Sequence, residues 1–175
     1  ISVYEDRMVF SEVSGGRRSL RVSAIGDTRS RELLNVAGWL QSVAWSPNGE
    51  YVAMVHVDTS GGWESARVAM QRVTPSGEPL GDMRYVSEQS FSWWNLRWLP
   101  DGRGVLAAGY EDGNVAFFPV DPSESSVSVT QDESNEVWEF VLSPDGRHIV
   151  YPRRMPRGSS LWLVDLGEIP ERIRN

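Results

Sequence analysis

Trp45-Ser-Pro-Asn-Gly49 is the first of three matching pentapeptides, and the other two are Trp98-Leu-Pro-Asp-Gly102 and Leu142-Ser-Pro-Asp-Gly146. In each of them the proline fixes φ for a turn, and the Asx-Gly pair tolerates the left-handed backbone that closes it. Apolar residues alternate before the proline, as Val43 and Trp45 do in the first copy, which is the pattern of a strand with one buried face. Each pentapeptide is therefore expected to join two neighbouring strands.

The turns recur at a spacing typical of stacked β-sheets. Their prolines, Pro47, Pro100 and Pro144, lie 53 and 44 residues apart. A period of about 40 to 55 residues with about four strands per unit is typical of β-propeller blades. We therefore predict an all-β protein built from propeller-type blades, each an antiparallel four-stranded sheet.

Strand-like segments follow each turn in the same order. The predicted second strands are Tyr51–Val57, Gly104–Tyr110 and His148–Tyr151. The predicted third strands are Arg67–Val73, Asn114–Val120 and Ser160–Leu166. Candidate outer strands, which are short and polar as edge strands tend to be, are Met83–Ser87 and Ser126–Thr130. An earlier copy, Arg7–Phe10 followed by Ser19–Ile25, lacks the turn motif, and its alignment puts the missing proline near Val3.

About four units are expected, approximately residues 1–36, 37–88, 89–131 and 132–166. Together they form a single domain of residues 1–166, followed by a C-terminal tail of residues 167–175. The first unit is expected to lack its inner strand, and the last is expected to stop near its third strand. Because a closed ring needs its terminal blade completed by strands from both ends, we predict an open or partial ring. It would be a piece of a larger propeller or a half ring completed by another chain.

The best copy of the repeat resembles a known family. Ser143-Pro-Asp-Gly-Arg-His-Ile-Val-Tyr151, followed by Ser160-Leu-Trp-Leu-Val-Asp-Leu166, is similar to the WD-like repeats of TolB-type propellers and of the propeller domains of prolyl-oligopeptidase-type enzymes. The resemblance covers most of residues 3–166, although Asn48 replaces the usual Asp and Leu99 the usual Ser. It implies blades that act as docking platforms, as periplasmic partners of membrane complexes, or as lids beside a separate peptidase domain.

Composition excludes several classes of partner. The net charge is −7, which argues against nucleic acid because phosphates usually require a basic face. All 17 basic residues are arginine, a residue that suits protein interfaces. The chain has no cysteine, so it forms no disulfide. No apolar run approaches the roughly 18 residues that predict a membrane-spanning helix.

No catalytic constellation is evident. An oligopeptidase nucleophile needs a Gly-x-Ser-x-Gly elbow, and Gly62-Trp-Glu-Ser-Ala66 has the wrong order. The only histidines, His56 and His148, fall at blade positions with no second ligand at metal-site spacing. Asp101 and Asp145 are equivalent turn residues, which are expected to bond to their own turn backbone. We therefore predict no enzymatic activity, no cofactor and no metal in this chain.

Five tryptophan and arginine residues that are expected at the surface are the candidates for partner binding. Trp63 lies in a lengthened loop beside two glycines, and Trp93 lies at the entry to the third unit. Arg153, Arg154 and Arg157 form a predicted loop that would dock onto an acidic partner or anionic lipid headgroups. Tryptophan and arginine are the residues on which protein interfaces depend most.

These observations favour a non-catalytic interaction or scaffolding module. We expect an accessory extracytoplasmic subunit that binds other protein subunits of a larger assembly. That assembly could be associated with a membrane, which this chain would contact only peripherally. Two alternatives stay open, namely the propeller domain of a serine peptidase and a ligand-sensing propeller of a regulator.

Overall fold

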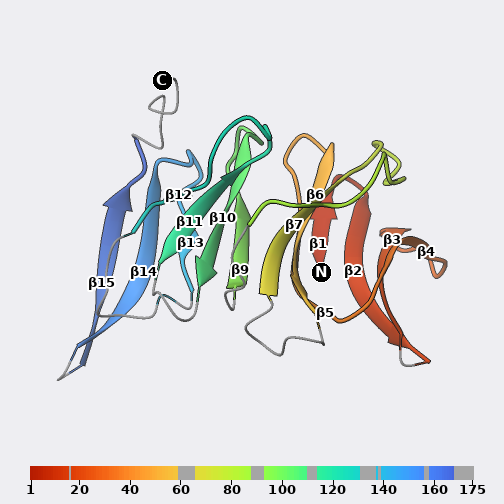
Figure 1. Ribbon diagram of the computed structural model, residues 1–175, viewed down its shortest axis with the longest axis horizontal. Coiled ribbons are helices and arrows are strands. Elements are labelled where there is room, and N and C mark those ends of the chain that lie inside the picture. The colour runs from red at the N-terminus through yellow and green to blue at the C-terminus, as the bar shows by residue number, and fades with distance from the viewer. Residues whose placement is uncertain are drawn as a thin grey trace.

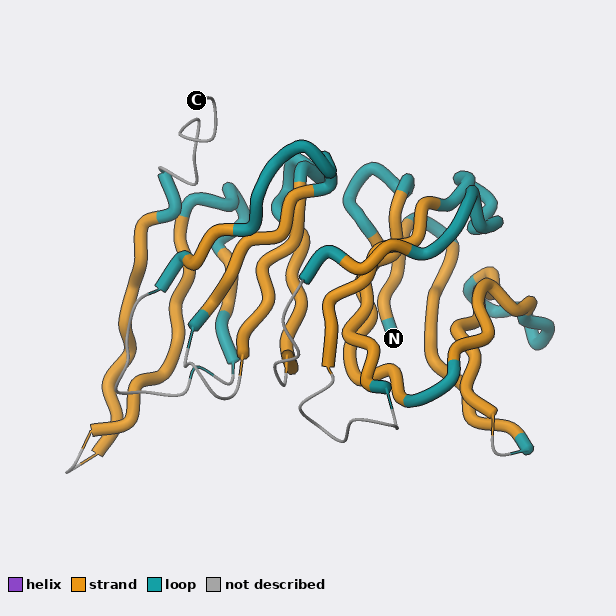
Figure 2. Tube along the Cα trace, in the orientation of Figure 1, coloured by secondary structure: helices purple, strands orange, loops and turns teal. Residues whose placement is uncertain are grey.

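Four antiparallel β-sheets follow one another along the chain and stand side by side in a row (Figure 1). The computed structural model describes residues 1–15, 17–58, 66–87, 93–109, 114–130, 137, 139–155 and 158–167. Within these residues every regular element is a strand (Figure 2). They contain no helix that is long and apolar enough to cross a membrane.

We call the sheets blades 1 to 4. Blade 1 consists of β1 (Ser2–Tyr4), β2 (Arg7–Ser14), β3 (Arg17–Ala24) and β4 (Arg31–Val36). Blade 2 consists of β5 (Trp39–Trp45), β6 (Tyr51–Val57), β7 (Ala66–Arg72) and β8 (Arg84–Tyr85). Blade 3 consists of β9 (Trp93–Trp98), β10 (Gly104–Gly109), β11 (Val115–Pro119) and β12 (Val127–Ser128). Blade 4 consists of β13 (Val141–Leu142), β14 (His148–Met155) and β15 (Gly158–Asp165).

Strands pair with their sequence neighbours in every sheet, which confirms the predicted all-β class and the antiparallel blades. Blades 1 and 4 lie at opposite ends of the row (Figure 1), so the described sheets form an open array rather than a closed ring.

The Pro-Asx-Gly turns have one hydrogen-bond pattern. The N–H of the residue before each proline donates to the carbonyl of the first residue of the next strand. The pairs are Ser46 with Tyr51 at 2.8 Å, Leu99 with Gly104 at 3.0 Å and Ser143 with His148 at 2.8 Å. The three turn glycines have φ values of 73°, 74° and 71°, so the left-handed geometry that the sequence predicts is present at each turn.

Each turn also lies against the turn of the preceding blade. A Cβ atom would meet Tyr4 at 2.4 Å if built on Gly49, Asn48 at 3.3 Å if built on Gly102, and Pro100 at 2.6 Å if built on Gly146. We call this row of contacts the turn ladder. Close approach requires glycine at Gly49 and Gly146, whereas at Gly102 the positive φ is the stronger requirement.

Blade 1 corrects the prediction that the first unit lacks an inner strand. β1 is that strand, because Val3 pairs with Met8 as Trp45 pairs with Val52 in blade 2. A tighter turn, with Glu5 at a φ of 50°, replaces the Pro-Asx-Gly turn. Val3 therefore takes the place of the strand tryptophan and not that of the missing proline. The sequence reasoning also assigned no strand to β4.

The core is divided into three apolar clusters, one between each pair of neighbouring blades. The cluster between blades 1 and 2 includes Val9, Leu20, Trp45, Val52 and Met54. The cluster between blades 2 and 3 includes Val55, Val68, Leu96, Trp98 and Val105. The cluster between blades 3 and 4 includes Leu106, Phe117, Phe140, Ile149 and Tyr151. Since burying one such side chain contributes about 1.5–3 kcal/mol, these clusters are the main force that holds the blades together.

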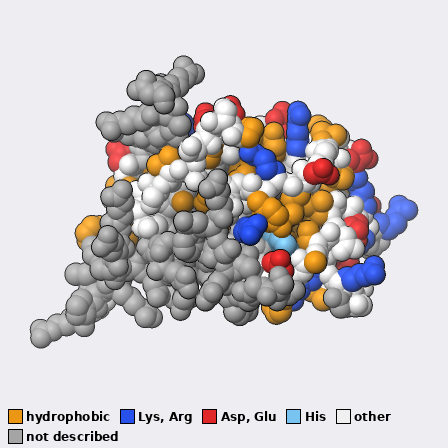
Figure 3. Space-filling model, viewed as in Figure 1, with side chains coloured by type: hydrophobic (Ala, Val, Ile, Leu, Met, Phe, Trp, Pro, Cys, Tyr) orange, Lys and Arg blue, Asp and Glu red, His pale blue; other side chains and the backbone are white. Residues whose placement is uncertain are grey.

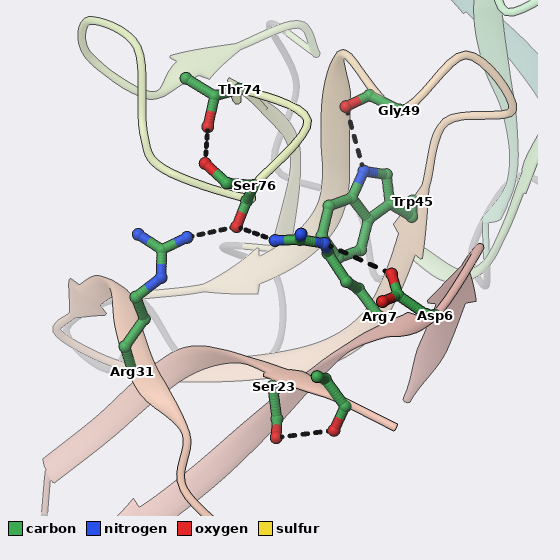
Figure 4. Close-up of polar contacts among 9 residues, drawn as sticks. Asp6, Arg7, Ser23, Arg31, Trp45, Gly49, Thr74 and Ser76 are labelled. Atoms are coloured by element: carbon green, nitrogen blue, oxygen red, sulfur yellow. Dashed lines mark hydrogen bonds and ion pairs between the residues drawn. The ribbon is translucent and has the colours of Figure 1, made fainter. Parts of the chain in front are cut away.

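The loop at residues 74–81, which joins β7 to β8 in blade 2, docks onto blade 1 (Figure 4). The carbonyl oxygen of Ser76 accepts hydrogen bonds from Arg7 Nη1 at 2.8 Å and Arg31 Nη2 at 2.5 Å. Gly77 follows in close contact with Val22 and Trp45. This loop therefore joins two blades of the same chain.

Candidate interaction site

Blade 4 is the least complete sheet of the row. Blades 1, 2 and 3 each end in an outer fourth strand, whereas no strand among the described residues lies beyond β15. β15 is thus an eight-residue edge strand at one end of the molecule (Figure 1). Such an edge presents a row of backbone donors and acceptors.

The outer strands of blades 2 and 3 show how such an edge is filled. The carbonyl of Val68 accepts the N–H of Val86 at 2.9 Å, and that of Val115 accepts the N–H of Val129 at 2.7 Å. A hydroxyl completes each contact. The N–H of Val68 donates to Ser87 Oγ at 3.0 Å, and the N–H of Val115 donates to Thr130 Oγ1 at 2.8 Å.

Leu161 occupies the same position in blade 4. In each blade the second-strand residue that lies eight positions after the turn proline marks the equivalent cross-strand pair. The pairs are Val55 with Val68, Ala108 with Val115 and Pro152 with Leu161. By this register the N–H and carbonyl of Leu161 point away from β14, toward the outer edge. No outer strand in the described part of the chain is there to bond with them.

The side chains of blade 4 are apolar on both faces of the sheet. On one face Tyr151, Val164 and Leu166 belong to the cluster shared with blade 3. On the other face Leu161 is 77% exposed and Leu163 is 65% exposed. Hydrophobic side chains reach the surface at this end of the row in Figure 3. With respect to the described residues, blade 4 therefore offers both an open backbone edge and an open apolar face.

The five predicted partner-binding residues fall partly outside the described structure. Trp63 and Arg157 lie outside the described residues. Trp93 lies in β9, where its backbone pairs with Gly109. The backbones of Arg153 and Arg154 lie in β14, opposite Ser160 and Ser159. The predicted arginine loop is corrected here, because β14 continues past Tyr151 to Met155 and makes both arginines strand residues.

The turn carboxylates bond within their own turns. Asp101 Oδ1 accepts the N–H of Arg103 at 3.0 Å. Asp145 Oδ1 accepts the hydroxyl of Ser143 at 2.5 Å and the N–H of Arg147 at 3.0 Å. These hydrogen bonds, that of Ser143 above all, hold the pKa of Asp145 below its ordinary value of 3.8.

His56 is buried in a polar cluster with Tyr85. Its Nε2 lies 2.5 Å from the carbonyl of Ala37 and its Nδ1 lies 2.7 Å from Tyr85 Oη. Because a carbonyl only accepts, Nε2 carries a proton, and in the neutral ring Nδ1 accepts the hydroxyl of Tyr85. Burial raises the pKa of Tyr85, and the nearby Arg67 opposes that rise. Charged and hydrophobic side chains gather beside a histidine on the face seen in Figure 3.

Both nitrogens of the His56 ring are thus occupied by groups of the same chain. Across the residues that the structure describes, no group of three histidine or carboxylate side chains is placed to hold a metal ion. The open edge and face of blade 4 are therefore the strongest candidate site in the described structure.

Comparison with known proteins identifies the architecture. No protein-family model and no curated protein matches the sequence. Solved structures match over nearly the whole chain. TolB from Acinetobacter baumannii aligns over 92% of this chain with a TM-score of 0.66 and 17% sequence identity. The four sheets are propeller blades. The predicted resemblance to TolB-type propellers is confirmed at the level of the fold.

Two further propeller matches have the same character. The putative TolB from Agrobacterium tumefaciens aligns over 92% of this chain with a TM-score of 0.69 and 17% identity. A puromycin-hydrolysing peptidase from Mycobacterium tuberculosis aligns over 94% with a TM-score of 0.65 and 20% identity. The aligned region spans 38% of the Acinetobacter TolB chain, 58% of the Agrobacterium chain and 29% of the peptidase.

The sequence reasoning missed Leu161 and Leu163 as site residues, although a signal for them was present. In Ser160-Leu-Trp-Leu-Val-Asp-Leu166 both alternating sets of residues are mainly apolar. A strand of that kind is typical of a sheet covered on both faces. Only one face of blade 4 is covered by another described blade.

Proposed function

We propose that this chain is a non-catalytic protein-interaction module whose partner adds an extended strand to the outer edge of β15. The observation that carries the proposal is the open edge at Leu161, where the equivalent edges of blades 2 and 3 receive an outer strand. Strand addition is a common mode of peptide recognition, in which main-chain hydrogen bonds supply affinity and alternate side chains supply specificity.

The polar groups of the described blades support a non-catalytic role. The carboxylates of Asp101 and Asp145 are used within their turns, and the ring of His56 is used between Ala37 and Tyr85. The module would serve as an accessory or scaffolding subunit of a larger, extracytoplasmic assembly at or near a membrane. Fractionation of the native cells, followed by detection of the chain, tests that location.

A peptide from the chain itself tests strand addition. Residues 123–130, Ser-Glu-Ser-Ser-Val-Ser-Val-Thr, include β12, which fills the same edge in blade 3. A fluorescently labelled copy of this peptide should bind the purified chain, as measured by anisotropy. The same peptide with Thr130→Val should bind more weakly, because it lacks the hydroxyl that accepts the N–H of the third strand.

Two variants of Leu161 separate the backbone edge from its side chain. Leu161→Pro removes an N–H that faces outward, so it should abolish peptide binding while leaving the pairing of β14 and β15 intact. Leu161→Ala keeps the N–H and should retain binding. Thermal unfolding of both variants checks that they fold. Equal binding by Leu161→Pro and the unaltered chain, or binding by neither, would refute strand addition.

The second candidate function is that of a propeller domain in a serine peptidase. Two of the similar structures favour it, namely the Mycobacterium tuberculosis peptidase and a prolyl endopeptidase that aligns over 93% of this chain at 16% identity and a TM-score of 0.64. The aligned region spans 29% and 27% of those chains. A Gly-x-Ser-x-Gly motif within an α/β pattern in the same reading frame would support this role.

A further inference from the structure

The blades make contact through two recurrent rows of side chains. One row has a member in each of the first three strands of a blade and faces the next blade along the chain. Cross-strand pairing defines these rows as Ala44–Ala53–Met70 in blade 2, Arg97–Leu106–Phe117 in blade 3 and Val141–Val150–Leu163 in blade 4. In blades 2 and 3 the members on the second and third strands are at most 2% exposed, because the next blade covers them.

Blade 4 keeps this row apolar although no described blade covers it. Val141 is 69% exposed and Leu163 is 65% exposed. Pro152 and Leu161, a pair whose equivalents in blades 2 and 3 are fully buried, extend the same face. We call Val141, Val150, Leu163, Pro152 and Leu161 the forward face. Its composition is that of an inter-blade contact and not that of a solvated surface.

The opposite row faces the preceding blade. Its members are Trp45, Val52 and Met54 in blade 2, Trp98, Val105 and Ala107 in blade 3, and Leu142, Ile149 and Tyr151 in blade 4. The pairing of Val3 with Met8 places Val3, Met8 and Phe10 at the same positions in blade 1. We call these three residues the rear face. All three are apolar, yet no described blade precedes them, and Val3 is 57% exposed.

The polar residues beside the rear face have partners of their own. Arg21 pairs with Phe10 across β2 and β3, and its Nε lies 3.3 Å from Glu12 Oε2. The same nitrogen donates to Ser30 Oγ at 2.7 Å. A sheet packed on the rear face would therefore meet apolar side chains beside an ion pair that is already formed.

We propose that two copies of this chain associate head to tail, with the forward face of one copy packed on the rear face of the other. Blade 4 of one copy then packs against blade 1 of the other, and the two blades meet through the same rows of residues that neighbouring blades use within the chain. The two faces lie at opposite ends of the row (Figure 1), so the contact is heterologous and repeats. Two copies that close on each other would place their eight described blades in one ring, within the known propeller range of about four to eight.

This association does not depend on the proposed strand addition. Side chains on the sheet faces carry the association, and the backbone N–H and carbonyl of Leu161 carry strand addition. Because Leu161 also belongs to the forward face, Leu161→Pro is compared with Leu161→Ala, and the difference between the two variants tests the edge alone. Charged substitutions at Leu163 and Val3 test the faces. A chain that self-associates without binding the residue 123–130 peptide, or the reverse, would separate the two proposals.

Sedimentation velocity over a wide concentration range measures the association. The unaltered chain should form a dimer. Leu163→Asp on the forward face and Val3→Asp on the rear face should each raise the dissociation constant by about 30-fold or more, as at interface hot spots. Leu80→Asp replaces an exposed leucine whose N–H bonds to Arg72 in blade 2 and which belongs to neither face, and it should leave the dimer unchanged. Circular dichroism melts confirm that the variants fold.

Mixing the two face variants gives the decisive readout. Leu163→Asp retains an intact rear face and Val3→Asp retains an intact forward face, so an equimolar mixture should recover one contact and form a heterodimer. Neither variant should do so alone. A monomeric unaltered chain would overturn the proposal. A second result would also overturn it: Leu163→Asp loses association, Val3→Asp associates as the unaltered chain does, and mixing the two restores nothing. That result would indicate a symmetric contact between two forward faces.

Discussion

Gly77 and Gly81 provide a matched pair that tests how the loop at residues 74–81 docks on blade 1. Both glycines have a positive φ, 79° and 71°. A Cβ atom built on Gly77 would lie 3.0 Å from Val22 Cγ1 and 3.1 Å from Trp45 Cη2, whereas one built on Gly81 meets nothing within 4 Å. Alanine therefore adds backbone strain at both positions and a side-chain clash at only one.

The structure sets different magnitudes for the two substitutions. The left-handed backbone costs alanine about 1–2 kcal/mol at either position. At Gly77 the neighbours are a buried valine on β3 and a buried tryptophan on β5, 4% and 5% exposed, so neither can move aside freely. Overpacking adds about 1–3 kcal/mol in such a site. The expected losses in the free energy of unfolding are about 1–2 kcal/mol for Gly81→Ala and about 2–5 kcal/mol for Gly77→Ala.

Urea unfolding followed by tryptophan fluorescence measures both losses. In a domain of this size 1 kcal/mol corresponds to about 2–4 °C in Tm, so thermal melts provide a second measurement. Equal losses in the two variants would refute the docking of Gly77 against Val22 and Trp45. A change in the slope of the urea transition would instead indicate altered compactness of the denatured or native state, or unfolding in separate steps.

Two further outcomes follow from hydrogen bonds of the blades. Ser87→Ala should lower the free energy of unfolding by about 1–3 kcal/mol, because the buried N–H of Val68 loses its acceptor. Thr130→Val should have the same effect in blade 3, where the N–H of Val115 loses its acceptor. A urea titration that shows no loss in either variant would contradict the reasoning. The lowered pKa of Asp145 means that its carboxylate stabilises the fold above the unfolded pKa and loses that effect as pH falls through the folded pKa. Asp145→Asn should therefore weaken the fall in stability below about pH 3.8, and an unchanged pH profile would count against this role.

The sequence predicts the interior of the array well, because turn chemistry is local. A proline followed by Asx-Gly fixes where a strand must start, and Gly104 and His148 do begin β10 and β14 as predicted. The inner strand of blade 1 was not predicted, because the tighter turn at Glu5 that follows it carries no proline. Only the pairing of Val3 with Met8 reveals the register.

The candidate site was harder to predict because it depends on what lies next to a strand. Leu161 and Leu163 look like ordinary buried strand residues, and their exposure follows from the lack of a described blade beyond them. Arg153 and Arg154 were expected in a loop because two prolines surround them. Instead their backbones continue β14, where Pro152 is accommodated opposite Leu161.

The turn ladder gives the row of blades a direction. Gly146 contacts Pro100 of the blade before it, and Gly49 likewise contacts Tyr4. Coupling between blades that passes through nearest neighbours makes stability a sum of local terms, as in other repeat proteins. In the monomer, damage at one rung should therefore loosen a single junction, and the amides of the two end blades should exchange with solvent sooner than those of the middle pair. Fraying from the ends inward is the behaviour that such a ladder imposes on the chain.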